Sequence, residues 1–463
     1  MSDRSVDGAA GRERDAVAFA EVALNLARQA GATAEVYWSF SERLPVSFEA
    51  GRLKRVETTR SQAFALRVLH EGRIGLSSTT VADDARSLVE RAMAGARYGP
   101  PAEFSFPPGG AYGGGCGGPT DADQWWDERI ASLPQDMLVE WGKEFVAELG
   151  EVEPGALAHA SLERQTGGMR VVNSAGLDVA YRKTVVQVFF AAELTEEGNF
   201  LHVYNWDASS RLDLDPPGLR RRVLEDLTAA RQNVTLPAGE YPVVLGPRAV
   251  RDLLGPVLAC VDGRAVRRGI SPWRNRLGEQ LFHPSFALID DGRLPAGPAS
   301  GVCDDEGVAT QRTPIVQEGI LRNFLLDLES AAALGKEPTG NATRGELADG
   351  PPQPRPTNLV LLPGDRPAAE LLGTIEDGLL VENFMGAWSG NLYAGVVTGN
   401  VALGFRLKGG QRVGRVKDCM LSVNAFTALR DHLGGLSRET VRLGDVTFPY
   451  VLLERATVTS RSS

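Results

Sequence analysis

Short strand-like segments joined by tight turns recur along the chain, and this pattern restricts the fold more than any other feature. The segments FALRVLH and RIGLSS are separated by Glu71-Gly72, and an earlier hairpin turns at Ala50-Gly51. Turns of this kind join neighbouring antiparallel strands. The half that begins at Tyr241 repeats the pattern, for example at Gln317-Glu318-Gly319. The sequence therefore predicts an α+β fold, with N-terminal helix/strand domains and a C-terminal strongly curved, largely antiparallel sheet with flanking helices.

Helices separate the strands and mark the expected domains. Apolar residues three and four positions apart predict helices over 15–30, 82–97 and 219–232, and Ser132 is expected to cap another. A chain of 463 residues exceeds what one hydrophobic core usually supports, so several domains are expected. The expected division is a disordered N-terminus (1–14), an N-terminal α/β domain (15–98), a Gly/Pro-rich loop (99–120), a central α/β domain (121–236) and a C-terminal domain (237–463).

The Gly/Pro-rich loop contains a formal G-x-G-x-x-G pattern. Its glycines are Gly113, Gly115 and Gly118, but no strand precedes them and Pro119 follows where a helix would begin. A dinucleotide-binding turn needs both elements, so the segment is interpreted as a glycine-rich loop. The sequence leaves the role of the loop around Cys116 open.

Charge and cysteine spacing exclude several classes of protein. The formal net charge is -10, which argues against a broad nucleic-acid-binding surface. The four cysteines lie far apart without a C-x-x-C pair, so a disulfide scaffold or a structural zinc knuckle is not expected. No apolar run approaches membrane-spanning length, and the first residues are polar. These features predict a cytoplasmic protein that does not associate with membranes.

Local motifs for catalysis are missing from the sequence. The chain has five histidines and no H-x-H or H-x-x-x-H pair, so no single helix can present two imidazoles to a metal. It also lacks the G-x-S-x-G turn of serine hydrolases and the G-x-x-x-x-G-K-[ST] phosphate loop. The sequence therefore predicts no catalytic residue and no metal ligand in this chain.

One acidic cluster, Cys303-Asp304-Asp305-Glu306-Gly307, is a candidate site. Side chains alternate along an extended chain, so at most Asp304 and Glu306 share a face. Such a pair suits glycosidase chemistry or a hard cation. The favoured alternative is a turn in which Asp305 or Glu306 accepts backbone N–H groups and Gly307 permits the geometry. Neighbouring negative charge disfavours a Cys303 thiolate, so Cys303 is expected to be a packed residue.

An ordered series of short motifs in the second half resembles a known family. The series runs through D-E-G at 305–307, N-F-L-L-D at 323–327, T-G-N-A at 339–342, P-T-N-L at 356–359 and T-G-N at 398–400. This order is similar to the C-terminal domain of the TldD/PmbA (TldD/TldE) family, and the N-terminal hairpins resemble that family's first domain. The resemblance covers roughly residues 15 to 435.

The resemblance implies a heterodimeric zinc metallopeptidase that trims leader, precursor or unfolded peptides. One subunit, TldD, carries an H-E-x-x-x-H helix and a later metal-binding cysteine, and the other, TldE or PmbA, lacks them. After the strand at 241–246 this chain reads PRAVRDLLGPVLACVDGRAVRRG, with neither histidine nor glutamate. Cys419 lies near the region of the TldD cysteine, with no histidines to join it. The chain therefore resembles the TldE subunit, which implies no cofactor of its own and zinc in a TldD-like partner.

The family resemblance also suggests where an extended peptide lies. The D-E-G turn would shape the inner surface of a two-subunit chamber, where a peptide could add to a sheet edge as a strand. The two T-G-N turns would let backbone approach the peptide closely. Ordinary turn chemistry is the competing interpretation of both. The candidate peptide-binding or cleft residues are Asp305, Glu306, Gly307, Thr339, Gly340, Asn341, Gly399 and Asn400.

Three functions remain open from the sequence. The first is a non-catalytic subunit that pairs with a TldD-like zinc-bearing chain. The second is a stand-alone peptide-binding homodimer, and the third is an enzyme with atypical ligands. A dimer is expected in either binding role, because closed two-fold interfaces are the usual assembly of soluble proteins. The sequence does not identify the natural peptide.

Overall fold

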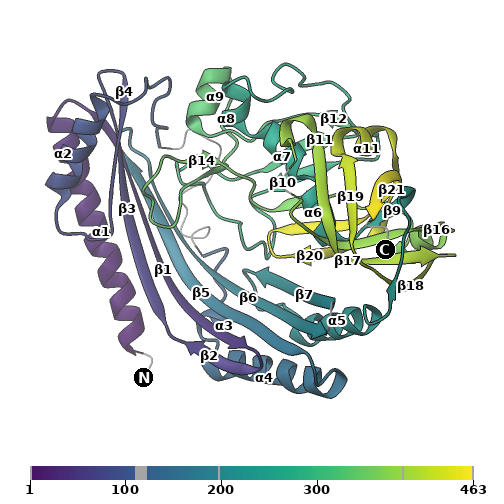
Figure 1. The fold of residues 1–463 in the computed structure, drawn as a ribbon. Coiled ribbons are helices and arrows are strands. Elements are labelled where there is room, and N and C mark those ends of the chain that lie inside the picture. The colour runs from purple at the N-terminus through teal and green to yellow at the C-terminus, as the bar shows by residue number, and fades with distance from the viewer. Residues whose placement is uncertain (1–2, 110–122, 197–198, 388–389, 461–463) are drawn as a thin grey trace.

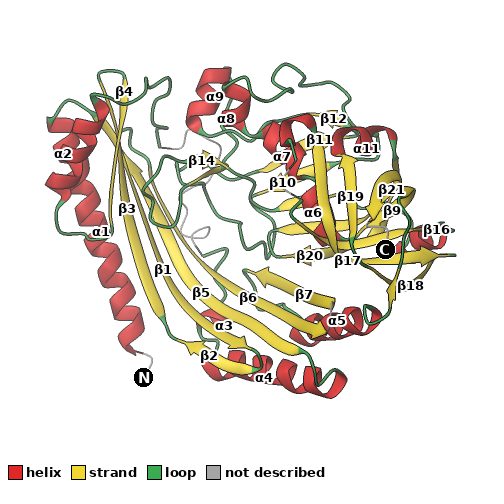
Figure 2. Cartoon of the chain, in the orientation of Figure 1, coloured by secondary structure: helices red, strands yellow, loops and turns green. Residues whose placement is uncertain are grey.

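The computed structural model describes residues 3–109, 123–196, 199–387 and 390–460 (Figure 1). Two large sheets dominate this part of the chain; helices cover the outer face of the first, and short helices pack among the strands of the second (Figure 2). The expected α+β class is confirmed. The glycine pattern at 113–118 and Cys116 lie outside the described residues.

The first sheet has seven strands in the order β4-β3-β1-β5-β6-β7, with β2 paired to β1, and all its pairs are antiparallel. Its long strands curve across the molecule (Figure 1). The strands are β1 (Thr33–Glu49), β2 (Arg52–Val56), β3 (Thr59–His70), β4 (Arg73–Thr79), β5 (Leu157–Asn173), β6 (Asp178–Glu196) and β7 (Asn199–Ser209).

This sheet unites segments that the sequence analysis assigned to separate N-terminal and central α/β domains. β1 pairs with β3 along one edge and with β5 along the other. The pairing of β1 with β5 spans more than one hundred residues of sequence, and local turn signals carry no information about it. The two expected domains therefore share one sheet.

Helices cover the face of this sheet that carries the even-numbered residues of β1. Val36 and Trp38 pack against α1 and α2, and Val46 and Phe48 pack in the cluster that contains α4. The opposite face, with Tyr37, is turned towards the C-terminal half. The helices are α1 (Asp3–Gln29), α2 (Ala85–Ala96), α3 (Glu128–Ala131), α4 (Gln135–Val152) and α5 (Pro216–Ala229).

Two local expectations in this half are wrong. Helix α1 begins at Asp3, so residues 3–14 are helical instead of disordered. The helix continues N-terminally from its packed part, which begins at Ala16, although Gly8 and Gly11 have low helix propensity. Ser132 does not cap α4, because its hydroxyl donates to the carbonyl of Glu128, the first residue of α3. Pro134 is the N-cap residue of α4.

The second sheet has twelve strands, mostly antiparallel, and it confirms the strongly curved C-terminal sheet. β21 pairs with β9 and β19, β9 with β16, β16 with β17, and β17 with β19, so these strands close on themselves. The strands are β8 (Asn233–Val234), β9 (Gly239–Leu245), β10 (Leu288–Asp291), β11 (Arg312–Gln317), β12 (Ile320–Leu321), β15 (Leu359–Leu361), β16 (Asp377–Met385), β17 (Val396–Lys408), β18 (Gln411–Val416), β19 (Cys419–Asn424), β20 (Leu433–Leu443) and β21 (Val446–Ser460).

Short helices and one small hairpin complete the C-terminal half. The helices α6, α7 and α11 pack on the curved sheet and share its core. None of the helices in the described part of the chain has the length and apolar composition needed to cross a membrane. The remaining elements are α6 (Pro247–Leu253), α7 (Gly255–Val261), α8 (Gly263–Arg267), α9 (Leu328–Leu334), β13 (Ala342–Thr343), β14 (Gln353–Pro354), α10 (Ala368–Gly373), the 3₁₀ helix η1 (Leu392–Ala394) and α11 (Ala425–Asp431).

Candidate functional site

The acidic cluster forms a tight buried turn between the two halves of the protein. The carboxylate of Asp304 accepts hydrogen bonds from the backbone N–H groups of Glu306 and Val308, both at 2.9 Å, and from that of Ala342 at 2.9 Å. Gly307 has φ +77°, which an L side chain rarely adopts. The turn interpretation is therefore correct, but Asp304 is the carboxylate that holds the turn, whereas the sequence suggested Asp305 or Glu306.

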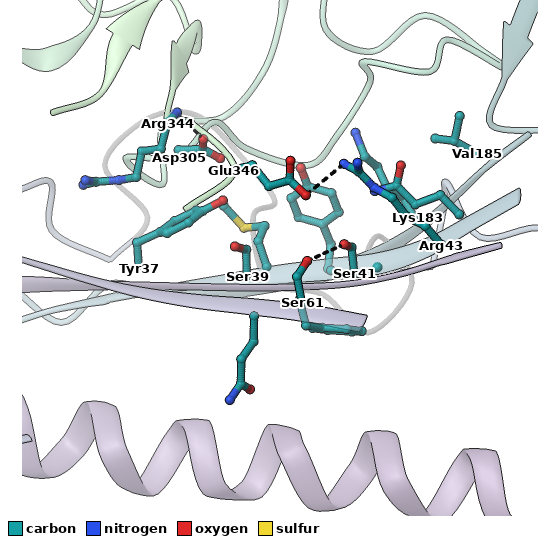
Figure 3. A pocket seen from close by; sticks show the side chains of 18 residues that line it. Tyr37, Ser39, Ser41, Arg43, Ser61, Lys183, Val185, Asp305, Arg344 and Glu346 are labelled. Atoms are coloured by element: carbon teal, nitrogen blue, oxygen red, sulfur yellow. Dashed lines mark hydrogen bonds and ion pairs between the residues drawn. The ribbon is translucent and has the colours of Figure 1, made fainter. Parts of the chain in front are cut away.

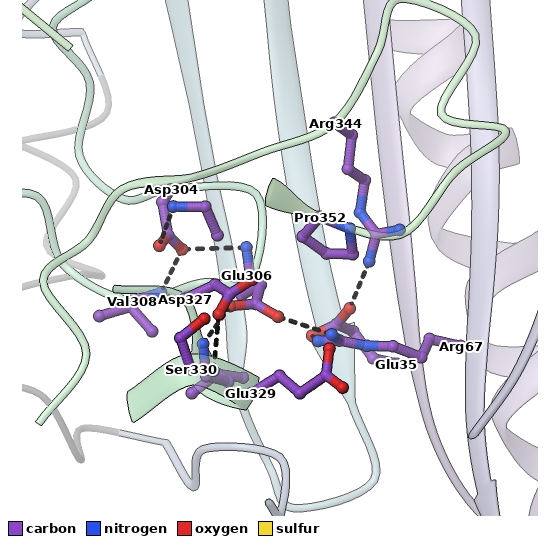
Figure 4. Close-up of polar contacts among 12 residues, drawn as sticks. Glu35, Arg67, Asp304, Glu306, Val308, Asp327, Glu329, Ser330, Arg344 and Pro352 are labelled. Atoms are coloured by element: carbon purple, nitrogen blue, oxygen red, sulfur yellow. Dashed lines mark hydrogen bonds and ion pairs between the residues drawn. The ribbon is translucent and has the colours of Figure 1, made fainter. Parts of the chain in front are cut away.

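Glu306 leaves this turn towards the first sheet and enters a buried ion-pair network (Figure 4). Nη1 of Arg67 lies 2.6 Å from Oε1 of Glu306, and Nη2 of Arg67 lies 3.0 Å from Oε2 of Glu35. The second carboxylate oxygen of Glu35 lies 2.8 Å from Nη2 of Arg344. Because two arginines face two glutamates, the charges balance, and side chains from both halves of the chain are fixed together.

Asp305 points the other way, into a cavity of about 230 Å³ on the inner face of the first sheet (Figure 3). Its carboxylate accepts a hydrogen bond of 2.6 Å from the backbone N–H of Arg344. The odd-numbered side chains of β1, from Tyr37 to Arg43, form part of the floor, and Lys183 on β6 lies at the side. Asp305 is thus the member of the acidic cluster that a small molecule could reach.

Burial changes the proton affinities around this cavity. Desolvation raises the pKa of the Tyr37 hydroxyl, and the Asp305 carboxylate raises it further. Desolvation also raises the pKa of Asp305, while the Arg344 N–H and guanidinium oppose this. The pKa of Lys183 is lowered, because burial disfavours its charged form more than Asp305 favours it. Ionisable groups of both signs therefore meet in one partly enclosed space.

The first T-G-N turn lies directly beside the acidic turn. The backbone N–H of Asp305 donates to the Ala342 carbonyl at 3.0 Å. The Thr339 hydroxyl accepts from the Leu326 N–H at 2.7 Å, and the Asn341 amide donates to Asp290 at 2.6 Å. Gly340 has φ +70°, and a Cβ there would lie 2.4 Å from the Ala309 carbonyl oxygen. Glu306, Gly307 and this turn are buried and stabilise the loops that cover the cavity.

The second T-G-N segment, at 398–400, is not a turn as expected: it lies within β17 and pairs with β19. Asn400 is exposed and lines a groove of about 1110 Å³ between β7 and the strands β16, β17 and β19. Gly399 lies under Ala387, whose Cα would be 3.1 Å from an added Cβ. The structure therefore brings Asp305 to Gly307 and Thr339 to Asn341 together, and places Asn400 at a separate groove, with Gly399 buried next to it.

Exposed apolar side chains gather in this groove. Phe200, Met385 and Met420 have exposed fractions of 57%, 62% and 38%, and all three line it. Cys419 also lines the groove, and burial raises the pKa of its thiol to about 11. A thiol with so high a pKa is protonated near neutral pH and is a poor nucleophile.

The edge strand β7 borders the groove, and arginines already bind two of its carbonyl groups. Arg415 donates to the Phe200 carbonyl at 2.9 Å, and Arg248 donates to the Tyr204 carbonyl. β7 is the last strand of its sheet, so these carbonyls would otherwise be open to a further strand. Strand addition along this edge would have to displace both arginines.

The helix that follows β9 does not fit a zinc ion. Its sequence, PRAVRDL, contains no histidine, cysteine or glutamate. Arg248 is buried there, 3.3 Å from Asp226 and 3.4 Å from Glu382, and Arg412 approaches the same two carboxylates. Guanidinium groups thus occupy the space beside these acids. Within the described ranges, no group of three or more His, Cys, Asp or Glu side chains is arranged to hold a metal.

Sequence reasoning missed Tyr37, Lys183 and Arg344 at the cavity, and Phe200, Met385 and Met420 at the groove. A signal for the cavity exists in the segment YWSFSER, where Tyr37, Ser39 and Ser41 alternate with the apolar Trp38 and Phe40. Such alternation indicates one polar and one apolar face of a strand. No local signal indicated that Lys183 and the loop at 344–346 would meet this face.

Comparisons with known proteins agree with the sequence resemblance. The PmbA/TldA metallopeptidase C-terminal domain matches residues 238–460, and PmbA/TldA metallopeptidase domain 1 matches residues 34–96. A metalloprotease of Methanothermobacter thermautotrophicus is 25% identical over 451 residues, which are 92% of this chain and 95% of that protein. A metalloprotease TldD homologue of Haemophilus influenzae is 32% identical over 167 residues, 36% of this chain and 34% of that protein.

A solved structure shares the fold. TldE from Thermococcus kodakarensis superposes with a TM-score of 0.85, covering 95% of this chain and 99% of that chain, at 21% sequence identity. At this level of identity, the likeness establishes the common architecture of both halves.

Proposed function

This chain belongs to the PmbA/TldD family of metallopeptidase-related proteins, and on that premise we propose that it is the TldE-like, non-catalytic subunit of a heterodimeric zinc metallopeptidase. The substrate class is an extended or unfolded peptide, such as a leader or precursor segment. A TldD-like partner holds the zinc, which supplies the activated water for hydrolysis when bound. This chain contributes part of the peptide-binding surface.

The observation that carries the proposal is the arrangement around Arg248. The resemblance places the metal-binding helix of TldD after β9, and in this chain Arg248 on that helix is bound to Asp226 and Glu382. A buried guanidinium repels a divalent cation, and removing it would leave two buried carboxylates to share Arg412. This charge arrangement, together with the lack of histidine, cysteine and glutamate on α6, supports the proposal of a subunit without its own zinc.

The apolar groove supports the peptide-binding part of the proposal. Phe200 and Met385 are more than half exposed in a groove large enough for several residues of an extended chain. Methionine side chains adapt to different apolar partners, which suits a substrate of variable sequence. Since Arg248 and Arg415 occupy carbonyls of β7, we assign the affinity mainly to side-chain contacts and exposed groups such as Asn400, and less to strand addition.

The test combines this chain with a TldD-like chain from the same genome. Hydrolysis of an unstructured peptide is measured with each chain alone and with both, and complex formation is measured by size-exclusion chromatography. The proposal predicts hydrolysis by the pair and none by this chain alone. Hydrolysis by this chain alone would instead establish an enzyme with atypical ligands. A homodimer that binds peptide and ignores the TldD-like chain would establish the stand-alone binding protein.

A further inference from the structure

The cavity at Asp305 is separate from the apolar groove, and its lining has an unusual composition. Serine hydroxyls cover part of its floor: Ser39 lies on β1, and the hydroxyls of Ser41 and Ser61 lie 2.9 Å apart on β1 and β3. Gly167 and Gly168 adjoin them on β5, where an added Cβ would lie 2.6 Å from the carbonyl oxygen of Phe40 or Tyr181 on a neighbouring strand. Glycine within a strand often marks a close approach of another backbone, and here it lets β1 and β6 pack against β5 beneath the cavity.

Charges of opposite sign lie at opposite ends of this cavity. Figure 3 shows Asp305 beside Tyr37 and Arg344 at one end and Lys183 near Val185 and Arg43 at the other. Asp305 comes from the covering turn, whereas Lys183 comes from β6 in the sheet. A ligand that spans the cavity would therefore meet a carboxylate at one end and an ammonium group at the other.

Most of the other charges in the lining are already paired. Arg344 is bound to Glu35 at 2.8 Å, and Arg43 lies 3.5 Å from Glu346. In the described chain, Lys183 forms no ion pair, and its ammonium donates one hydrogen bond, to the Pro298 carbonyl at 3.2 Å. An ammonium group has three donors, so Lys183 retains capacity for a carboxylate.

The remaining walls are apolar or aromatic. The side chains of Tyr37, Met169 and Tyr181 line the cavity together with the polar groups. Mixed linings of this kind hold an apolar body through contact area and fix its orientation through a few polar groups. At about 230 Å³, the cavity suits a ligand of one or two amino-acid residues.

We propose that this cavity binds a small zwitterion, namely a free dipeptide or amino acid, with its carboxylate at Lys183 and the serine hydroxyls and its ammonium group at Asp305. This inference goes beyond the peptidase role, because the site belongs to this chain alone and needs neither zinc nor a partner. A dipeptide also belongs to the product class that a peptidase releases.

The test pairs chemical changes in the ligand with single substitutions in the full chain. Alanyl-leucine, its N-acetyl derivative and its C-terminal amide are titrated by isothermal calorimetry. Charge-assisted hydrogen bonds make each terminus worth roughly tenfold or more in affinity, so both derivatives should bind at least ~10-fold more weakly than the dipeptide.

Two variants assign each terminus to one residue. In Lys183→Met the free acid and the amide should bind equally, while the N-acetyl derivative still binds more weakly than the dipeptide. In Asp305→Asn the free and acetylated amines should bind equally, while the acid is still preferred over the amide. Lys143→Met, on the exposed surface of α4, is the matched control and should leave all three affinities unchanged.

The comparison of two variants with three ligands separates the loss of a ligand contact from general damage to the fold, because such damage would weaken the binding of all three ligands alike. The proposal is overturned if alanyl-leucine does not bind at 10 mM, roughly the weak limit for a specific small-ligand site. It is equally overturned if the two derivatives bind as well as the dipeptide, or if inorganic phosphate binds more tightly than the dipeptide. It is also overturned if Lys183→Met still prefers the acid over the amide and Asp305→Asn still prefers the free amine over the acetylated one.

Discussion

Arg67 and Glu306 join the two halves of the protein, with Nη1 of Arg67 2.6 Å from Oε1 of Glu306 although the residues are 239 positions apart. Both side chains are almost fully buried. Arg67 also stacks on the rings of Phe104 and Phe106, with its Cζ atom 4.9 and 5.2 Å from the ring centroids. The pair therefore fixes the acidic turn above the first sheet, and with it the position of Asp305.

Replacing Arg67 by methionine should destabilise the protein strongly. Glu35 and Glu306 would lose their common counter-charge while remaining buried, and breaking a buried ion pair in this way costs about 3–5 kcal/mol. The free energy of unfolding is measured by urea denaturation. Arg60→Met is the control, because the Arg60 side chain is 63% exposed and pairs with Glu42 at 2.7 Å, so its loss should cost less than about 1 kcal/mol. Equal costs for the two variants would contradict the structural role of the network.

Gly340→Ala should destabilise the protein more than Gly335→Ala does. Both glycines have positive φ angles, +70° and +62°, so both substitutions carry the left-handed backbone cost of about 1–2 kcal/mol. An added Cβ at Gly340 would lie 2.4 Å from the Ala309 carbonyl oxygen, whereas at Gly335 it would meet nothing within 4 Å. The difference between the two unfolding free energies measures the close approach of the T-G-N turn to the acidic turn. Equal destabilisation by the two substitutions would contradict the close packing of residue 340 against the Ala309 carbonyl.

Asp290 should make stability depend on pH. Burial raises the pKa of its carboxyl from 3.8 to about 6. Folding therefore favours the neutral form, and this contribution to stability is fully present below about pH 4 and is lost as the pH rises through about 6. Asp290→Asn is neutral throughout, so between pH 4 and 7 the wild type should lose roughly 2 kcal/mol relative to the variant.

Urea denaturation at several pH values tests this expectation. The Asn341 amide faces Asp290 at 2.6 Å, and its own oxygen has no hydrogen-bond partner in the described chain. It can rotate to accept from the new amide, and the loss of its bond to the Arg355 carbonyl then costs the same at every pH. Asp83→Asn, at an exposed position, should retain the wild-type pH profile. If the free energy of unfolding depends on pH in the same way for the wild type and Asp290→Asn, the pKa of Asp290 is not raised by folding.

Met385→Glu should reduce peptide binding by the groove without affecting the fold. Met385 is 62% exposed, so the stability change should stay within about 0.5 kcal/mol. A charge in an apolar groove disfavours apolar side chains of the substrate, and we expect at least ~10-fold weaker hydrolysis by the two-subunit complex. Val81→Glu, 52% exposed on the first half, is the control and should leave hydrolysis unchanged. Unchanged activity in Met385→Glu would exclude the groove as the peptide site.

Features encoded by neighbouring residues could be predicted from the sequence. Glu71 and Gly72 have φ angles of 50° and 71°, and Glu318 and Gly319 have 52° and 74°, as their hairpin turns require. The buried position of Cys303 was also predictable, because acidic neighbours disfavour the reactive thiolate and a free cysteine is then usually a packed residue. Local rules succeed here because the turn or the charge environment is contained within a few residues.

Features that depend on distant pairing were not predictable. The cavity combines Tyr37 from β1, Lys183 from β6 and Arg344 from a loop of the C-terminal half, and the pairing of β1 with β5 brings the first two together. Glu306 binds Arg67, and Asp304 accepts the backbone N–H groups of the turn. No local sequence pattern indicates Arg67 as the partner of Glu306. In both cases the missing information is the contact between the two halves of the chain.

The zinc content of this chain alone tests the central claim most directly. The purified chain is dialysed exhaustively, and bound zinc is measured by inductively coupled plasma mass spectrometry against its protein concentration. The non-catalytic role predicts a zinc-to-protein ratio near zero, because α6 carries Arg248 between Asp226 and Glu382 and offers no metal ligand set. A ratio near one that resists dialysis would contradict it, and would mean that ligands from distant segments form a metal site in this chain.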